Sequence, residues 1–111
     1  MYVISRMIKI EKGYDQTIVE RFNKPSPIFK FKGFIKREIL LDKKNKAYDV
    51  LNISTYFEDK KAFYRWEGSP EHIQLHKDRK HIPNQKPEGV ISVEAHYYEL
   101  ALLQTYSEEV S

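Results

Sequence analysis

The segment of residues 2–11 has a period of two, and this pattern constrains the fold of the chain more than any other. One face is apolar apart from a single arginine: Tyr2, Ile4, Arg6, Ile8 and Ile10. A period of two with one apolar face predicts a β-strand that buries that face. Arg6 is unexpected there, because a guanidinium is costly to bury without a partner. We expect it to pair with a carboxylate, such as Glu38 or Glu94, or to face a cavity.

A helix is predicted to follow this strand. Gly13 ends the strand, and Asp15 is suited to cap the helix at its first turn. The helix has a stripe of apolar side chains that would face the core: Ile18, Val19 and Phe22. Pro25 and Pro27 come directly afterwards and are expected to stop the helix, since proline cannot continue it.

Three further strands and a second helical segment are predicted downstream. Residues 33–41 and 47–57 are rich in β-formers and are joined by a polar turn, which predicts a hairpin. The helical segment covers residues 62–81. A loop with two prolines over residues 81–89 then leads to a long fourth strand over residues 90–103.

The order β-α-β-β-α-β is that of the split βαβ, or ferredoxin-like, arrangement. It predicts an α+β fold with a four-stranded antiparallel sheet and both helices on one sheet face. Residues 1–103 would form the single domain and residues 104–111 a C-terminal tail. Apolar residues are expected on both sheet faces, so the uncovered face would need a partner, most simply a second copy. The residues that suggest this are Val50, Tyr56, Val93 and Tyr97.

The segment of residues 62–81 is predicted to break into two helices at Gly68-Ser69-Pro70. Glycine is common where a helix ends, serine is a common cap of the next helix, and proline is favoured at the first helical position. Without the break, Trp66 and His76 would lie about 15 Å apart along one helix axis. With it, both rings can line one cavity, and the basic residues after His76 would suit the anionic rim of a flat apolar ligand. Those residues are Lys77, Arg79 and Lys80. The alternative is that Trp66 fills the core and His76 is an ordinary surface histidine.

The composition excludes several kinds of site and partner. The chain has 111 residues and no cysteine, which predicts one domain without disulfides or thiolate metal sites. A net charge of +3 is small for a nucleic-acid binder, and the basic run of residues 77–81 lacks interleaved aromatics. No segment approaches the ~18 apolar residues of a membrane span, and the N-terminus lacks the apolar core of a signal peptide. We expect a cytoplasmic protein that binds neither nucleic acid nor membrane.

The histidines offer one further possibility. His72 and His76 are spaced i, i+4 on the predicted helix, so they share a face and could chelate a metal. Zinc would need a third ligand, for which His81 is a poorly placed candidate, and His72 is otherwise expected at the surface. His96 lies on the fourth predicted strand and is expected to be an ordinary strand histidine.

Several short motifs occur together with a common spacing: Gly13, Glu20-Arg21-Phe22, Gly33-Phe34, Ala62-Phe63 before Trp66, and Ser69 before His76-Lys77. In this combination the chain resembles the IsdG-type haem-degrading monooxygenases, which belong to the antibiotic biosynthesis monooxygenase superfamily. The resemblance extends over about residues 2–98. It implies a dimeric α+β barrel with one haem per subunit, held between the helices and the sheet.

The resemblance also implies roles for individual residues. His76 is expected to be the axial ligand of the haem iron through a neutral imidazole nitrogen. Trp66 is expected to press against the porphyrin and distort it, so that the ring itself is oxidised. Phe22 and Phe63 would form pocket walls, and Arg21 would lie near a propionate.

Arg6 departs from the family pattern, which has an asparagine at this position of the first strand. Both side chains donate hydrogen bonds, so Arg6 is expected either to contact an oxygen-bearing ligand or to signal changed activity. The implied function is haem degradation with dioxygen and an external electron donor, with release of iron. The alternatives are a haem-binding module without turnover, a cofactor-independent monooxygenase acting on an aromatic or quinone substrate, and a dimeric domain without catalysis.

Overall fold

A computed structural model describes residues 1–80 and 88–109, with the side chains of residues 78–80 left out. The loop predicted over residues 81–89 therefore falls mostly outside the described residues, as do His81 and the side chains of Arg79 and Lys80. The elements, in chain order, are β1 (Tyr2–Glu11), α1 (Asp15–Phe22), the 3-10 helix η1 (Pro27–Lys30), β2 (Phe34–Asp42), β3 (Tyr48–Phe57), α2 (Lys60–Glu67), α3 (Pro70–Lys80) and β4 (Val90–Glu99).

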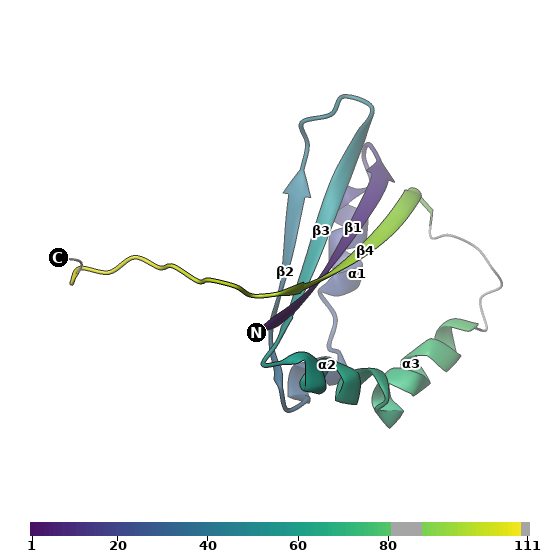
Figure 1. Cartoon of the computed structure of the whole chain (residues 1–111). Helices are drawn as coiled ribbons and strands as arrows, with labels where there is room; N and C mark the ends of the chain where they lie inside the picture. Colours follow the sequence, from purple (N-terminus) through teal and green to yellow (C-terminus); the bar gives the residue numbers. More distant parts are fainter. Residues whose placement is uncertain (81–87, 110–111) are drawn as a thin grey trace.

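The four strands form one antiparallel sheet in the order β2-β3-β1-β4 (Figure 1). The two central strands are thus β1 and β3, and the hairpin β2–β3 lies on one side of β1 while β4 lies on the other. This is the predicted ferredoxin-like α+β fold. No helix in the described ranges is long and apolar enough to cross a membrane.

The core lies on one face of the sheet and consists of two separate clusters. Ile18 of α1 packs over one end of the central strands, together with Ile8, Ile10, Leu51 and Ile53. The other end is covered by α2 and η1, in a cluster of Tyr2, Ile28, Phe57, Ala62, Phe63 and Trp66. The predicted inward face of β1 is thereby confirmed, and Arg6 is the residue of that face that lies between the two clusters.

The observed starts of the helices agree only in part with those predicted from the sequence. Asp15 does not cap α1: Tyr14 occupies the cap position without a side-chain bond, and the Asp15 carboxylate instead pairs with Lys43 at 3.2 Å. The 3-10 helix η1 was not predicted. Ser26 caps it by accepting a bond from the Ile28 amide at 3.4 Å, and Ile28 is buried in the core.

The predicted break between two helices is confirmed at residues 68–70. Gly68 ends α2, and Pro70 is the first residue of α3. The Ser69 hydroxyl donates to the Trp66 carbonyl at 2.6 Å and accepts from the His72 amide at 3.2 Å. One hydroxyl therefore joins the end of α2 to the start of α3 and fixes the turn between them.

The other sheet face is polar at its centre. The hydroxyls of Ser5 and Ser54 both donate to the Asn52 side-chain oxygen, at 2.7 and 3.3 Å. Val50 and Tyr56 lie on this face, paired with Lys9 and Val3, respectively. The expected apolar residues of β4 lie elsewhere: Val93 and Tyr97 pair with Ile8 and Ile4 on the helical face, where each is 54% exposed.

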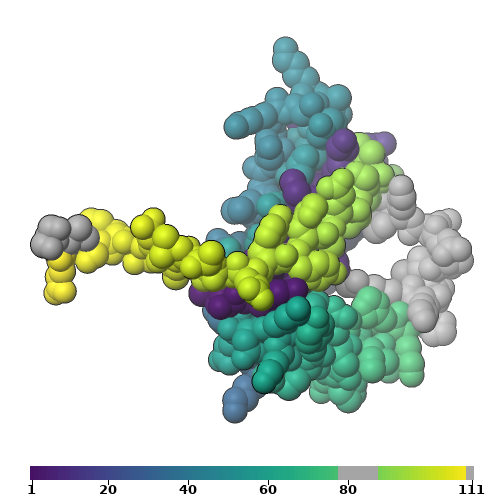
Figure 2. Space-filling model, in the orientation of Figure 1, coloured from purple at the N-terminus to yellow at the C-terminus, as the bar shows by residue number. Residues whose placement is uncertain are grey.

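The fourth strand is shorter than predicted, because β4 ends at Glu99 rather than at residue 103. The Leu100 amide still donates to the Met1 carbonyl at 2.9 Å. Beyond it, the chain runs away from the sheet as an extended segment (Figures 1 and 2). Apolar side chains on this segment are largely exposed: Leu102 72%, Leu103 63% and Tyr106 84%.

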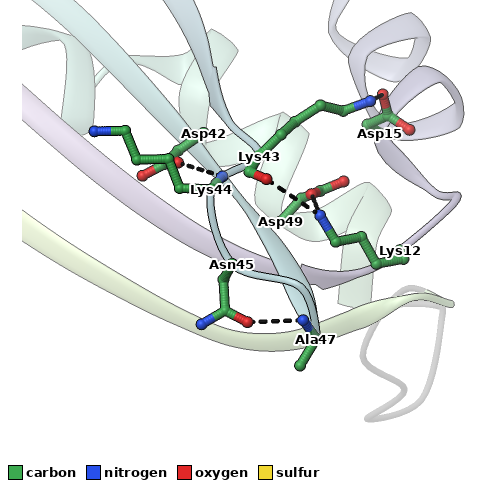
Figure 3. A network of polar contacts seen from close by, with 8 residues as sticks. All are labelled: Lys12, Asp15, Asp42, Lys43, Lys44, Asn45, Ala47 and Asp49. Atoms are coloured by element: carbon green, nitrogen blue, oxygen red, sulfur yellow. Dashed lines mark hydrogen bonds and ion pairs between the residues drawn. The ribbon is translucent and has the colours of Figure 1, made fainter.

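A polar network holds the β2–β3 turn against the N-terminal part of the chain (Figure 3). The Lys12 ammonium lies 2.5 Å from the Asp49 carboxylate, whose side chain is only 1% exposed. Lys43 reaches from the turn to Asp15 on α1. Within the turn, Asp42 and Asn45 accept bonds from the amides two residues onward, at 2.9 and 2.8 Å.

Candidate functional site

A cleft opens on the helical face of the sheet, between the two core clusters. Its cavity volume is about 120 Å³. The sheet contributes Arg6, Arg37 and Tyr97 to its lining. The helices contribute Phe22, Phe63, Trp66, Glu67 and His72. Four of these residues were predicted from the sequence to belong to the site: Arg6, Phe22, Phe63 and Trp66.

Trp66 belongs to the core and to the cleft wall at once. Its side chain is 6% exposed. The Phe31 ring packs edge-on against it at a centroid distance of 5.3 Å, and the His72 ring lies on another side, also at 5.3 Å. Trp66 is therefore a core residue and also a residue of the cleft wall, but it does not share the cleft with His76 as predicted.

His72 lies where the turn between α2 and α3 brings the chain back over Trp66. Its Nδ1 is 2.9 Å from the Glu67 carbonyl oxygen, and its Nε2 is 3.0 Å from the Nε2 of His76. His72 lines the cleft, contrary to its predicted surface position. His76 is not among the lining residues, and its exposed ring contacts His72 edge-on at 4.4 Å.

Two cations line the cleft. Glu38 and Glu94 pair with Lys36 and His96 instead of Arg6, so the second expectation for Arg6, that it faces a cavity, is confirmed. Arg37 was missed by the sequence analysis. Its Nε donates to the Thr55 hydroxyl at 3.3 Å.

The remaining predicted residues divide between the cleft and the surface. Phe22, at the end of α1, and Phe63, on α2, both line the cleft, whereas Arg21 is exposed outside it. Tyr97 was not predicted to belong to the site. Its ring lies 5.8 Å from Phe63, and its place opposite Ile4 puts it on the helical face.

The described residues hold no cluster of three or more histidine, aspartate or glutamate side chains suited to a metal ion. The zinc site considered from the sequence would need His81, which lies outside them. His96 bonds Glu94 on the opposite sheet face at 3.4 Å. The side-chain groups that line the cleft include an imidazole, a carboxylate, aromatic rings and guanidinium groups.

Residues 1–78 match the family model of the antibiotic biosynthesis monooxygenases. The chain belongs to this family. The match includes every cleft residue except Tyr97.

A haem-degrading monooxygenase of Shouchella clausii is 30% identical over 104 residues, which is 94% of each protein. A Bacillus cereus structure described as an antibiotic biosynthesis monooxygenase superposes with a TM-score of 0.79 at 23% identity, covering 95% of this chain and 97% of that one. The haem degrader MhuD of Mycobacterium tuberculosis, with two haems bound in its active site, gives 0.63 at 17% identity, covering 95% and 100%. The two structural similarities support the fold.

Proposed function

We propose that this family member is a haem-degrading monooxygenase, which uses dioxygen and electrons from an external donor to open the porphyrin ring and release iron. The observation that carries the proposal is the meeting of Trp66, His72 and Arg6 in one cleft. The name of the Shouchella clausii relative, at 30% identity over nearly the whole chain, points the same way.

The chemistry of the cleft suits a haem. Imidazole is a common axial ligand of haem iron, and aromatic rings match the flat apolar macrocycle. Guanidinium groups bind carboxylates such as propionates through paired hydrogen bonds. The cleft is small, however, because pockets that enclose a drug-sized ligand measure roughly 300–1,000 Å³. A haem bound here would extend from the mouth or widen the cleft.

When bound, the haem would supply the iron chemistry that activates dioxygen and would itself be the substrate. Trp66 would form a rigid wall of the haem site. Its indole packs against Phe31 and the core, so it would not move when a porphyrin contacts it. Phe22 and Phe63 exclude water from the cleft. Arg6 donates hydrogen bonds to oxygen atoms of the ligand.

A histidine of α3 would hold the haem iron, and the family resemblance gives this role to His76. Arg21 was expected near a propionate; its exposed position leaves it a role only at the edge of a haem that extends from the cleft.

The decisive experiment is a titration of the purified protein with haemin, followed by ascorbate in air with catalase present. A Soret band of a histidine complex should form and then bleach, with iron released to a ferrous chelator. A band that forms but never bleaches would contradict turnover and favour the haem-binding module. In that case Arg6→Asn, which installs the family's usual residue, should be tested for restored bleaching. Arg65→Asn serves as the matched control for loss of a guanidinium, because Arg65 is exposed and lies outside the cleft lining.

The small cleft favours a second candidate, a cofactor-independent monooxygenase for an aromatic or quinone substrate. A cavity of about 120 Å³ accommodates a small ring more readily than a tetrapyrrole. No iron ligand is needed for that chemistry. Absence of any haemin spectrum, together with oxygen uptake on addition of a hydroquinone, would select this function.

We also propose that the protein works as a homodimer. The extended segment after Leu100 exposes Leu102, Leu103 and Tyr106 without a neighbour of the same subunit beside it (Figure 2), and exposed apolar surface of this kind is typical of interfaces. Sedimentation velocity should give twice the mass of the 111-residue chain. Removal of residues 101–111 should shift the protein toward monomer.

A further inference from the structure

One row of cleft residues crosses all four strands on the helical face of the sheet. Arg37 of β2 pairs with Thr55 of β3. Thr55 in turn pairs with Ile4 of β1, which pairs with Tyr97 of β4. All four residues line the cleft. Since β2 and β4 are the two edge strands (Figure 1), the row spans three strand spacings, or about 14 Å. The row therefore has a cation at one end and an aromatic ring at the other.

Two contacts orient the Arg37 guanidinium at its end of the row. Its Nε donates to the Thr55 hydroxyl at 3.3 Å, and its Cζ lies 6.0 Å from the centroid of the Phe29 ring. A guanidinium is a planar fork of five N–H donors, so one such group can serve both Thr55 and a ligand. The fork matches the two oxygens of a carboxylate, whereas a lysine offers only a point charge.

The side chains of the lining suit a flat anion. Among the described residues that line the cleft, Arg6 and Arg37 carry positive charge and Glu67 alone carries a carboxylate. Glu67 is the exposed last residue of α2. At the far end of the row, the rings of Tyr97 and Phe63 lie 5.8 Å apart and offer an aromatic surface. A ligand with a carboxylate on one side and a flat apolar body on the other matches both ends.

We infer that Arg37 is a specificity-determining residue of the cleft, which binds the carboxylate of a flat aromatic ligand at the β2 end of the row. Thr55 positions the guanidinium, and the apolar body of the ligand extends toward Tyr97. The carboxylate has two possible sources, a propionate of a porphyrin or a small aromatic acid that enters the cleft by itself. Only the first source rests on the proposed function.

The test compares two acids with neutral analogues of similar shape. Haemin and haemin dimethyl ester are titrated by their Soret absorption. Benzoate and benzamide are titrated by the fluorescence of Trp66, the one tryptophan of the chain, which reports on the cleft because it lines it. The quantity compared is the ratio of the two dissociation constants within each pair, which we call the acid preference.

Three variants separate the role of Arg37 from that of charge in general. Arg37→Gln removes the cation, and Arg37→Lys keeps the charge without the fork. Lys36→Gln is the matched control, because Lys36 is the neighbouring cation of β2 and pairs with Tyr56 on the opposite sheet face. Circular dichroism checks that each variant is folded.

The wild type should show an acid preference in at least one pair, and that pair identifies the source of the carboxylate. Arg37→Gln should reduce the preference about 10–100-fold, the usual contribution of hydrogen bonds to a charged group. Arg37→Lys should retain part of the preference, and Lys36→Gln should retain all of it.

Three results would overturn the inference. They are a wild type without an acid preference in either pair, an unchanged preference in either Arg37 variant, and an equal loss in Lys36→Gln and Arg37→Gln. If Arg37→Gln does not fold, Arg37→Lys decides the question. Failure of haemin to bind, with benzoate still preferred over benzamide, would overturn the proposed haem function and leave the role of Arg37 intact.

Discussion

The indole of Trp66 meets the ring of Phe31 edge-on, with their centroids 5.3 Å apart and their planes at 65°. Phe31 lies just after η1, at the end of a segment in which Ser26 and Pro27 set the chain direction. The position of the cleft wall therefore depends on a short helix that itself contributes Ile28 to the cleft. A substitution that changes how Phe31 or η1 packs against Trp66 would therefore also move the cleft wall.

Trp66→Ala is expected to destabilise the fold by about 3–5 kcal/mol, the usual cost of truncating a buried aromatic. Trp66→Phe should retain most of that stability, because a ring still meets Phe31. Urea unfolding followed by circular dichroism measures both effects. If Trp66→Phe remains folded and binds haemin yet bleaches it as fast as the wild type, the proposed wall role of the indole is wrong.

Gly33→Ala should destabilise the protein more than Gly13→Ala. Both glycines have positive φ, at +105° and +93°, so each substitution introduces strain of about 1 kcal/mol. Only at Gly33 would the new Cβ also meet another atom, Ala62 Cβ of α2 at 2.7 Å. We expect a loss of about 2–3 kcal/mol for Gly33→Ala. Equal urea midpoints for the two variants would contradict the close approach of α2.

Lys12→Met is expected to cost about 2 kcal/mol, because it leaves the buried Asp49 carboxylate without its cation. The methionine keeps much of the lysine stem, so the change reports mainly on the charge. Lys44→Met in the same turn is the control, since the Lys44 side chain is exposed. Thermal unfolding at neutral pH should separate the two variants, and identical melting temperatures would refute the importance of the pair.

Acid should weaken the contact between α1 and the β2–β3 turn. The hydrogen bond from Lys43 lowers the pKa of Asp15 below its usual 3.8. Because the folded-state pKa is the lower one, the pair stabilises the fold above about pH 3.8, and this contribution is lost as the pH falls through the folded-state value. Asp15→Asn should thus melt below the wild type at pH 6, with the difference shrinking below pH 3.8. A constant difference across this range would argue against the linkage.

Much of the fold could be predicted because its signals are local. The apolar face of β1 follows from a period of two, and the α2–α3 break follows from the preferences of glycine, serine and proline at helix ends. The end of β4 depends instead on a neighbour. Glu99 pairs with Tyr2, the first residue of β1, so the β-forming residues after it have no strand to continue against.

The cleft was predicted less completely, since its residues converge only in three dimensions. Arg37 and Tyr97 reach it from the two edge strands, and neither residue has a local pattern that marks it. His72 had a usable signal, because its place three residues after the Ser69 cap puts it in the turn that folds back onto Trp66. The resemblance gives the iron-ligand role to His76 instead, and that assignment stays a prediction.

The Ser69 hydroxyl bonds the Trp66 carbonyl on one side and the His72 amide on the other. The spacing of two residues that face the same cleft is therefore set by a single oxygen that is not part of the cleft wall. Position 69 gives protein engineers a means of changing the distance between the Trp66 and His72 rings, and so the width of the cleft, with every lining residue left in place.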